Sequence, residues 1–227
     1  MRYPYLLGVA AALLVACDGP LIPERPGIAD DAYNFALPPP YAPLVYRWPT
    51  GHTIRVFIAA GADPARLTIL RDSVFLPAAT AWESAVLYRE FSFALSERVE
   101  DADVVLAWSD AELPIDVTGC PPPTGAVAVT VFCPGEEPGR LLPFPMKPPD
   151  TATSRVRMLV VIRGVEVSNP PSARNFGAHE LGHVLGIGRH SSNREDVMFG
   201  YPTTYRPTRA DRATIRLLYH TTPDLIP

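Results

Sequence analysis

Two histidines, His179 and His183, lie four residues apart in a largely apolar stretch near the end of the sequence. On an α-helix this spacing places both imidazoles on one face, one turn apart, where their nitrogens can bind a single Zn²⁺ at about 2.0–2.1 Å. Glu180 follows the first histidine, so its carboxylate can take a proton from a water molecule that the metal activates. The pattern HExxH therefore predicts a metal site with an adjacent general base.

A third nitrogen ligand is available a short distance further along the chain. Gly186 can adopt a positive φ, end the helix and turn the chain back, so that His190 returns toward the first two histidines. The alternative is an ordinary amphipathic helix with two surface histidines. That alternative does not account for three of the five histidines of the chain falling within twelve residues.

The segment resembles the metzincin signature HExxHxxGxxH followed by a methionine turn, most closely that of the matrixin (matrix-metalloprotease) branch. The resemblance implies that Met198 forms an apolar floor under the ligands and that the cation is a single Zn²⁺. It also implies a zinc endopeptidase that hydrolyses peptide bonds in extended substrates, with Glu180 as general base. Weaker likenesses flank the signature at Trp82-Glu83 and at residues 102–105 and 208–219.

The sequence departs from that signature at one position. Arg189 stands where the family has its third histidine, and His190 comes one residue later. Arg189 cannot act as the ligand, because a guanidinium stays protonated and has no lone pair to donate. Gly188 can absorb the extra residue as a bulge, and the spacing from His190 to Met198 matches the family. We therefore expect His190 to be the third ligand.

Hydrophobic periodicity predicts the elements that position these residues. Alternation over residues 52–59 predicts a strand, and Asp63-Pro64 predicts the start of a helix that runs to about residue 90 with a kink at Pro77. Further strands are expected at 91–96, 103–108, 125–132 and 155–162, and helices from about 169–172 to 186 and at 209–219. This order predicts an α+β (α/β layered) domain with helices packed against a mixed sheet. The resemblance implies the same architecture, a twisted mixed sheet on long helices.

The strand expected at 125–132 has two interpretations. By resemblance, Gly125, Val127 and Val129 belong to an edge strand above the cleft, and an extended substrate would pair with it by β-augmentation. The same alternation fits an ordinary strand of the sheet, which needs no substrate.

The amino-terminal sequence predicts export. One arginine precedes an apolar run that is shorter than the ~20 residues of a membrane-spanning helix, as is typical of a signal peptide, here residues 1–16. The sequence LVAC resembles a bacterial lipoprotein box, which implies that Cys17 is lipidated and anchors the chain to a membrane of the cell envelope. Plain secretion is the alternative, and the choice between inner and outer membrane stays open.

Proline content divides the exported chain. Seven prolines lie in residues 18–47, which predicts that residues 17–47 are the lipidated cysteine and a semi-rigid stalk. The catalytic domain would then be residues 48–227. Within it, one disulfide is predicted between Cys120 and Cys133, because the compartments outside the cytoplasm are oxidising. Two zinc thiolates are the weaker alternative, since neither cysteine belongs to a CxxC pair.

Charge limits the partners. The balance of 20 Lys+Arg against 24 Asp+Glu gives −4, and the basic residues form no cluster, so nucleic acid is not expected as the main partner. Whether a structural Ca²⁺ is bound stays open. No calcium-site motif is found, and Asp101, Asp103 and Asp110 are expected to be solvated acids.

A rival from another class is a non-catalytic surface lipoprotein that keeps a zinc-stabilised fold as a binding module. The intact Glu180 argues against this rival, since a binding module has no need of that carboxylate, whereas the displaced His190 favours it. A zinc hydrolase that acts on a bond other than a peptide is a third interpretation, because the motif alone does not define the substrate.

Overall fold

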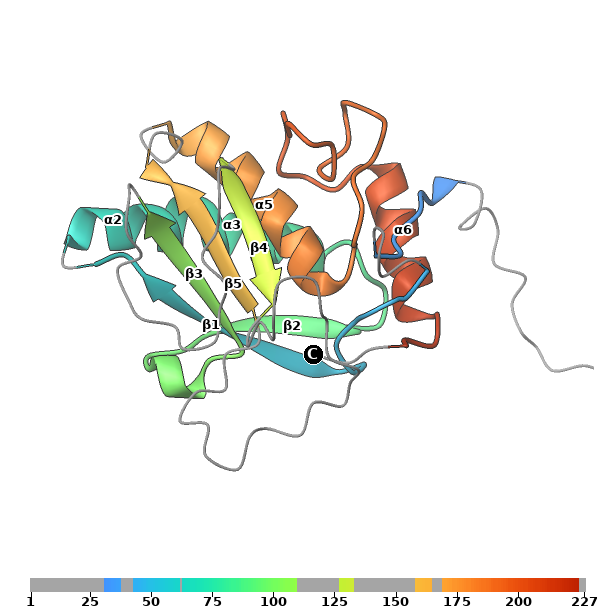
Figure 1. Ribbon diagram of the computed structural model, residues 1–227, viewed down its shortest axis with the longest axis horizontal. Helices are drawn as coiled ribbons and strands as arrows, with labels where there is room; N and C mark the ends of the chain where they lie inside the picture. Colours follow the sequence, from blue (N-terminus) through green and yellow to red (C-terminus); the bar gives the residue numbers. More distant parts are fainter. Residues whose placement is uncertain are drawn as a thin grey trace, which may run out of the picture.

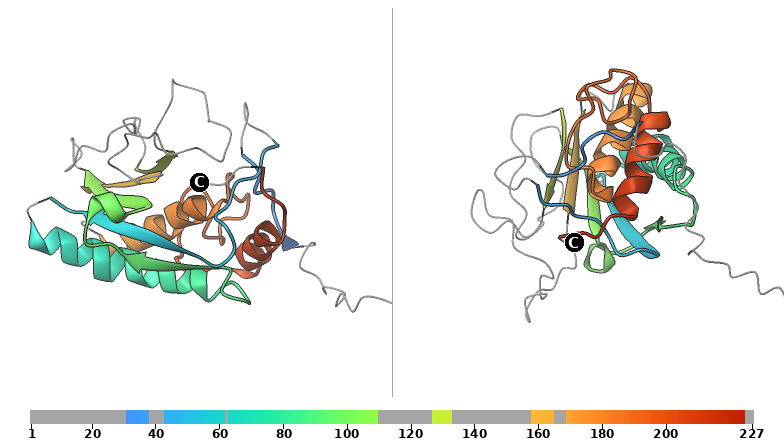
Figure 2. Two further views of the ribbon diagram at one scale, coloured as in Figure 1. Left: turned by 90° about the horizontal axis from the view of Figure 1, so that it is seen from below. Right: turned by 90° about the vertical axis from the view of Figure 1, so that its right-hand side faces the viewer.

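The computed structural model describes residues 31–37, 43–61, 63–109, 127–132, 158–164 and 169–224. A five-stranded sheet carries a layer of helices on one face (Figures 1 and 2). The strands are β1 (His52–Ala59), β2 (Phe91–Leu95), β3 (Val104–Ser109), β4 (Ala128–Phe132) and β5 (Met158–Arg163), in the order β2-β1-β3-β5-β4. β2, β1, β3 and β5 are parallel to one another, and β4 pairs antiparallel with β5. The mixed sheet and its helical layer agree with the predicted α+β architecture.

The helical layer contains α2 (Pro64–Thr68), the π-helical segment η1 (Ile69–Phe75), α3 (Leu76–Glu83), α5 (Pro170–Leu185) and α6 (Arg209–Tyr219). A short 3₁₀ segment, η2 (Val99–Asp101), precedes β3. The first three segments follow one another without a break and correspond to the long helix predicted to start at Asp63-Pro64. Helical structure ends at Glu83, whereas the prediction extended it to about residue 90. The wide turns of η1 lie immediately before Pro77, where a proline interrupts the regular hydrogen bonding of an α-helix.

The core lies mainly between the sheet and the helices. Trp48, Phe75 and Trp82 are among its largest fully buried side chains. A smaller apolar cluster covers the opposite face of the sheet, from Ala59, Val105, Ala107, Leu159 and Val161. Strands β3 and β5 are therefore buried on both faces, which explains their continuous apolar sequences.

Residues 31–37 and 43–47, here called the amino-terminal strap, pack against this domain instead of extending from it as a stalk. Tyr33 donates its hydroxyl proton to Asp211 Oδ1 on α6 at 2.6 Å, and the Phe35 carbonyl accepts from the Gly188 amide at 2.8 Å. Leu37 and Tyr46 are 5% and 2% exposed. The packed domain thus begins before residue 48, because the strap supplies apolar side chains to its core.

Several predicted features lie outside the described residues: the signal peptide, the lipidation site Cys17, the disulfide candidates Cys120 and Cys133, Gly125 and Asp110. Asp103 is not a solvated acid as expected. It is 5% exposed, and its Oδ2 accepts the Arg55 amide at 2.9 Å. Asp101 is exposed. Within the described ranges, no helix has the length and apolar character needed to cross a membrane.

Replacing Tyr33 with Phe should test the docking of the strap. The hydroxyl donates to a fully buried carboxyl group, so its loss should lower the free energy of unfolding by about 1.5–3 kcal/mol, as for hydrogen bonds to charged groups. Urea denaturation would measure the change. Tyr88→Phe is the matched control, because Tyr88 is 76% exposed. Equal stabilities of the two variants would contradict the docking.

Candidate metal centre

The helix α5 begins after Asn169 with two prolines in its first turn and ends at Leu185. Gly186 follows with φ 118°, in the left-handed region. The amides of Gly186 and Ile187 donate to the His183 and Gly182 carbonyls, each at 3.0 Å, so they satisfy carbonyls that the helix end leaves open. A Cβ at Gly186 would lie 2.3 Å from the Tyr46 carbonyl oxygen. The reversal therefore requires glycine, as the sequence predicts.

Aromatic side chains fix the position of α5 along its axis and its rotation about that axis. Trp82 Nε1 donates to the Ala178 carbonyl at 2.7 Å and Trp48 Nε1 to the Val184 carbonyl at 2.8 Å, both in the core. The Tyr46 hydroxyl donates to the carbonyl of His183. These donors come from α3 and from the chain before β1, so the helix is tied to two separate parts of the domain.

The structure brings the three predicted histidines together. One ligand nitrogen from each of His179, His183 and His190 lies within 4.8 Å of the other two. His179 is buried, His183 is half-buried and His190 is exposed. The cluster therefore opens to solvent on the side of His190, and an ion can reach it from that side.

The second nitrogen of two of these rings identifies the tautomer. His179 Nδ1 lies 2.8 Å from the Val197 carbonyl oxygen, and His183 Nδ1 lies 2.6 Å from that of Ile187. Since a carbonyl only accepts, each Nδ1 must carry a proton, which leaves the Nε2 lone pair for a cation. Burial lowers the pKa of His179 to about 4 and that of His183 to about 3, so both rings are neutral at pH 7. Neutral imidazoles held in this way fit Zn²⁺.

Glu180 lies beside the cluster with its side chain turned into the protein. It is 4% exposed, and its Oε2 accepts a hydrogen bond from Thr130 Oγ1 on β4 at 2.7 Å. Burial raises the pKa of the Glu180 carboxyl to about 7, against the opposing effect of the Thr130 hydrogen bond. Without a bound cation, the Glu180 carboxyl can therefore gain or lose a proton near neutral pH.

Sequence reasoning missed Thr130. It lies in the strand predicted at 125–132, and its side chain points to the helical layer, whereas Val129 and Val131 pack on the opposite face of the sheet. The alternation of valines predicts that Thr130 faces the other way. No sequence pattern connects it with Glu180, because the two residues are 50 positions apart and meet only through the packing of β4 beside α5 (Figure 1).

Arg189 points away from the histidine cluster, as its exclusion as a ligand requires. Its guanidinium donates to the carbonyls of Ala36 and Leu37 in the strap, at 3.2 and 3.4 Å. Gly188 does not adopt a positive φ. Glycine is needed there because a Cβ would lie 2.9 Å from the Leu37 Cα. The close approach of the strap thus constrains Gly188 and Arg189.

Met198 is fully buried beneath the histidine-bearing helix, and a Cβ on Gly182 would lie 2.2 Å from its Sδ. The carboxylate of Asp211 accepts the amides of Val197 and Met198 at 2.9 and 3.4 Å. The Ser191 amide donates to the Met198 carbonyl at 2.8 Å, which closes the loop that follows His190. Met198 is therefore held against α5 by backbone contacts on both sides of the loop.

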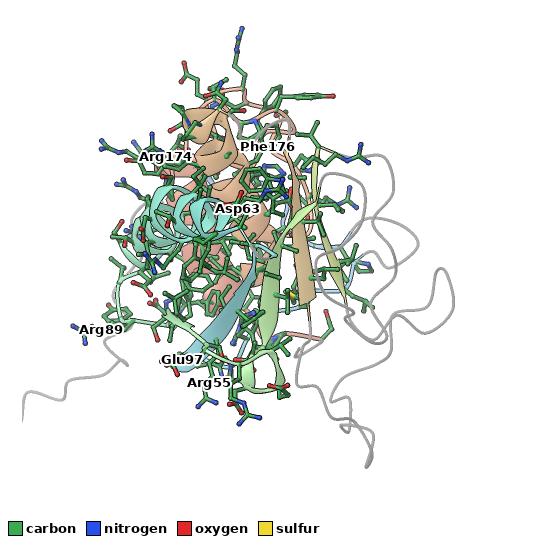
Figure 3. All side chains as sticks on the ribbon, turned by 90° about the vertical axis from the view of Figure 1, so that its left-hand side faces the viewer. Arg55, Asp63, Arg89, Glu97, Arg174 and Phe176 are labelled. Atoms are coloured by element: carbon green, nitrogen blue, oxygen red, sulfur yellow. The ribbon has the colours of Figure 1, made fainter. Side chains whose placement is uncertain are left out.

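The first turns of α5 have a further attachment that the sequence does not indicate. Arg174 and Phe176 lie there, at the upper end of the molecule in Figure 3. The Arg174 guanidinium lies over the Tyr205 ring, 4.2 Å from its centroid. This cation–π contact joins the start of the helix to the chain after Met198.

Among known proteins, neither a protein-family model nor a curated sequence matches this chain. The interpretation of the site therefore depends on its own residues and their geometry.

The contact between Gly182 and Met198 can be tested with Gly182→Ala. The added methyl group meets the Met198 sulfur and also lies 3.0 Å from Trp82 Cζ2, so overpacking should lower the free energy of unfolding by about 1–3 kcal/mol. Gly200→Ala is the control, because its Cβ would come no closer than 3.5 Å to His190. Thermal and urea denaturation would measure the stability of both variants. If Gly182→Ala were as stable as the control, the close contact between Gly182 and Met198 would be contradicted.

Proposed function

We propose that this protein is a zinc-dependent endopeptidase of the metzincin type, most similar to the matrixins. The observation that carries the proposal is the convergence of three imidazole nitrogens beside a buried carboxylate. Two of the imidazoles and the carboxylate come from one turn of α5, the arrangement that the HExxH pattern specifies. Three protein ligands leave one position open on a four-coordinate ion, as in catalytic zinc sites.

His179, His183 and His190 would hold the cation through neutral nitrogens, the first two oriented by the carbonyls that accept their Nδ1 protons. Zn²⁺ held by these three histidines would act as a Lewis acid, which polarises a carbonyl group and lowers the pKa of water. Glu180 takes the proton of the attacking water and returns it to the nitrogen of the leaving amine. Its burial raises the carboxyl pKa above the usual value of a glutamate, which suits a group that both takes and returns a proton.

The edge strand β4 supports an extended peptide as substrate. The Arg163 amide donates to the Val127 carbonyl at 3.0 Å, so Val127 and, two residues on, Val129 direct their backbone groups at β5. The alternation then directs the amides and carbonyls of Ala128 and Thr130 away from β5, at the edge of the described sheet. Backbone pairing with a substrate would therefore use Ala128 and Thr130, and not the predicted Val127 and Val129.

The amino-terminal sequence supports a location for this activity. A signal peptide over residues 1–16 and lipidation of Cys17 would anchor the protein to a membrane of the bacterial envelope. The substrates would then be exported proteins or peptides, met in an unfolded or loop conformation.

Replacing Glu180 with Ala tests the reaction. The wild type should bind one Zn²⁺ per chain and cleave members of a diverse peptide mixture, read by mass spectrometry. The variant should keep its zinc, because Glu180 is not a ligand, and lose turnover by about 100-fold to 10,000-fold. Glu195→Ala is the matched control, since Glu195 is exposed.

Two results would overturn the proposal. Equal cleavage by the wild type and the Glu180 variant would exclude Glu180 as the base. Zinc binding without any cleavage would favour the rival function, a zinc-stabilised binding module.

A pair of proline substitutions tests the edge strand. Ala128→Pro removes an amide that points away from β5, so the fold should persist while kcat/KM for peptides falls roughly tenfold through loss of substrate pairing. Val129→Pro removes an amide directed at β5 and should instead lower the free energy of unfolding by at least about 1 kcal/mol. Steady-state kinetics and thermal denaturation would separate the two effects. Unchanged kinetics in a folded Ala128→Pro protein would exclude β4 as the substrate strand.

A further inference from the structure

We infer that Thr130 is a positioning residue for the general base: its hydroxyl donates to Glu180 Oε2 and leaves Oε1 to take the proton. The inference rests on the proposed function, and it assigns a role to a residue outside the HExxH segment. The contact joins β4 to α5 at 2.7 Å, shorter than the 3.2 Å between the same hydroxyl and the Glu180 backbone carbonyl.

The chemistry of the pair favours this orientation. A carboxylate that takes a proton from water is ionised and only accepts, so in that state the hydroxyl proton of Thr130 is the one shared with Oε2. Such charge-assisted bonds are stronger than neutral ones and fix the direction of the acceptor. A glutamate has three side-chain torsions, and a catalytic carboxylate must be held within a fraction of an ångström of its working position. One directed donor from the rigid sheet meets that need.

The position of Thr130 also connects the base with the substrate. Its backbone amide and carbonyl belong to the edge that would pair with an extended peptide. Its side chain contacts Glu180 on α5. A peptide seated on β4 would thus be aligned with the base by one residue. No other side-chain donor to the Glu180 carboxylate is found in the described part of the chain.

The experiment compares Thr130→Val, which keeps the shape and removes the hydroxyl, with Thr130→Ser, which keeps the hydroxyl. Thr53→Val is the matched control, because Thr53 lies on β1 and its hydroxyl meets Ser92. All three variants of the full chain should bind zinc as the wild type does. For Thr130→Val we expect kcat to fall roughly 10-fold to 100-fold with KM within about threefold. Thr130→Ser should restore most of that loss.

Crystal structures of the zinc-loaded wild type and Thr130→Val provide a readout that does not depend on turnover. The Glu180 carboxylate should keep its contact with Thr130 in the wild type and adopt another or several orientations in the valine variant. An unmoved carboxylate would overturn the inference even for a protein that cleaves no peptide. Equal losses in Thr130→Val and Thr130→Ser, or kcat of Thr130→Val equal to that of Thr53→Val, would overturn it too. Absence of cleavage by the wild type itself would instead refute the proposed function.

Discussion

The reversal of the chain at Gly186 is the constraint on which the candidate site depends. Two histidines of one helix can form only one side of a metal site, and His190 comes close to them because the chain reverses at Gly186 with φ 118°. An L-residue in that region costs about 1–2 kcal/mol, and here a Cβ would also meet the Tyr46 carbonyl at 2.3 Å. The glycine thus serves the packing of the strap and the convergence of the three histidines at once.

A second constraint lies in Asp211, the third residue of α6. Its carboxylate accepts the Val197 and Met198 amides, and the Tyr33 hydroxyl from the strap. It also completes a capping box with Thr208 at the start of α6. The same side chain therefore starts a helix, holds the backbone of Met198 and fastens the strap. Because Val197 in turn accepts the His179 Nδ1 proton, this network reaches a candidate ligand.

The sequence predicts what depends on local pattern. The strands and helices, the four-residue spacing of His179 and His183, and the turn at Gly186 all follow from periodicity and from the properties of single residues. Contacts between distant segments are different. The bond from Thr130 to Glu180, the docking of Tyr33 on Asp211 and the cation–π pair of Arg174 with Tyr205 depend on which elements meet. A proline-rich composition also predicts extension, but it cannot reveal that residues 31–37 carry apolar side chains that the core accommodates.

The strap also holds the two residues before His190, the point at which the sequence departs from the metzincin signature. Gly188 has no positive φ. Its amide donates to the Phe35 carbonyl, and Arg189 donates to the next two carbonyls of the strap. Residues 188 and 189 are thus paired with a neighbouring segment, and the long side chain of Arg189 points away from the histidine cluster. His190 joins the histidine cluster while Arg189 is held by the strap, so the strap contributes to the geometry of the candidate metal centre.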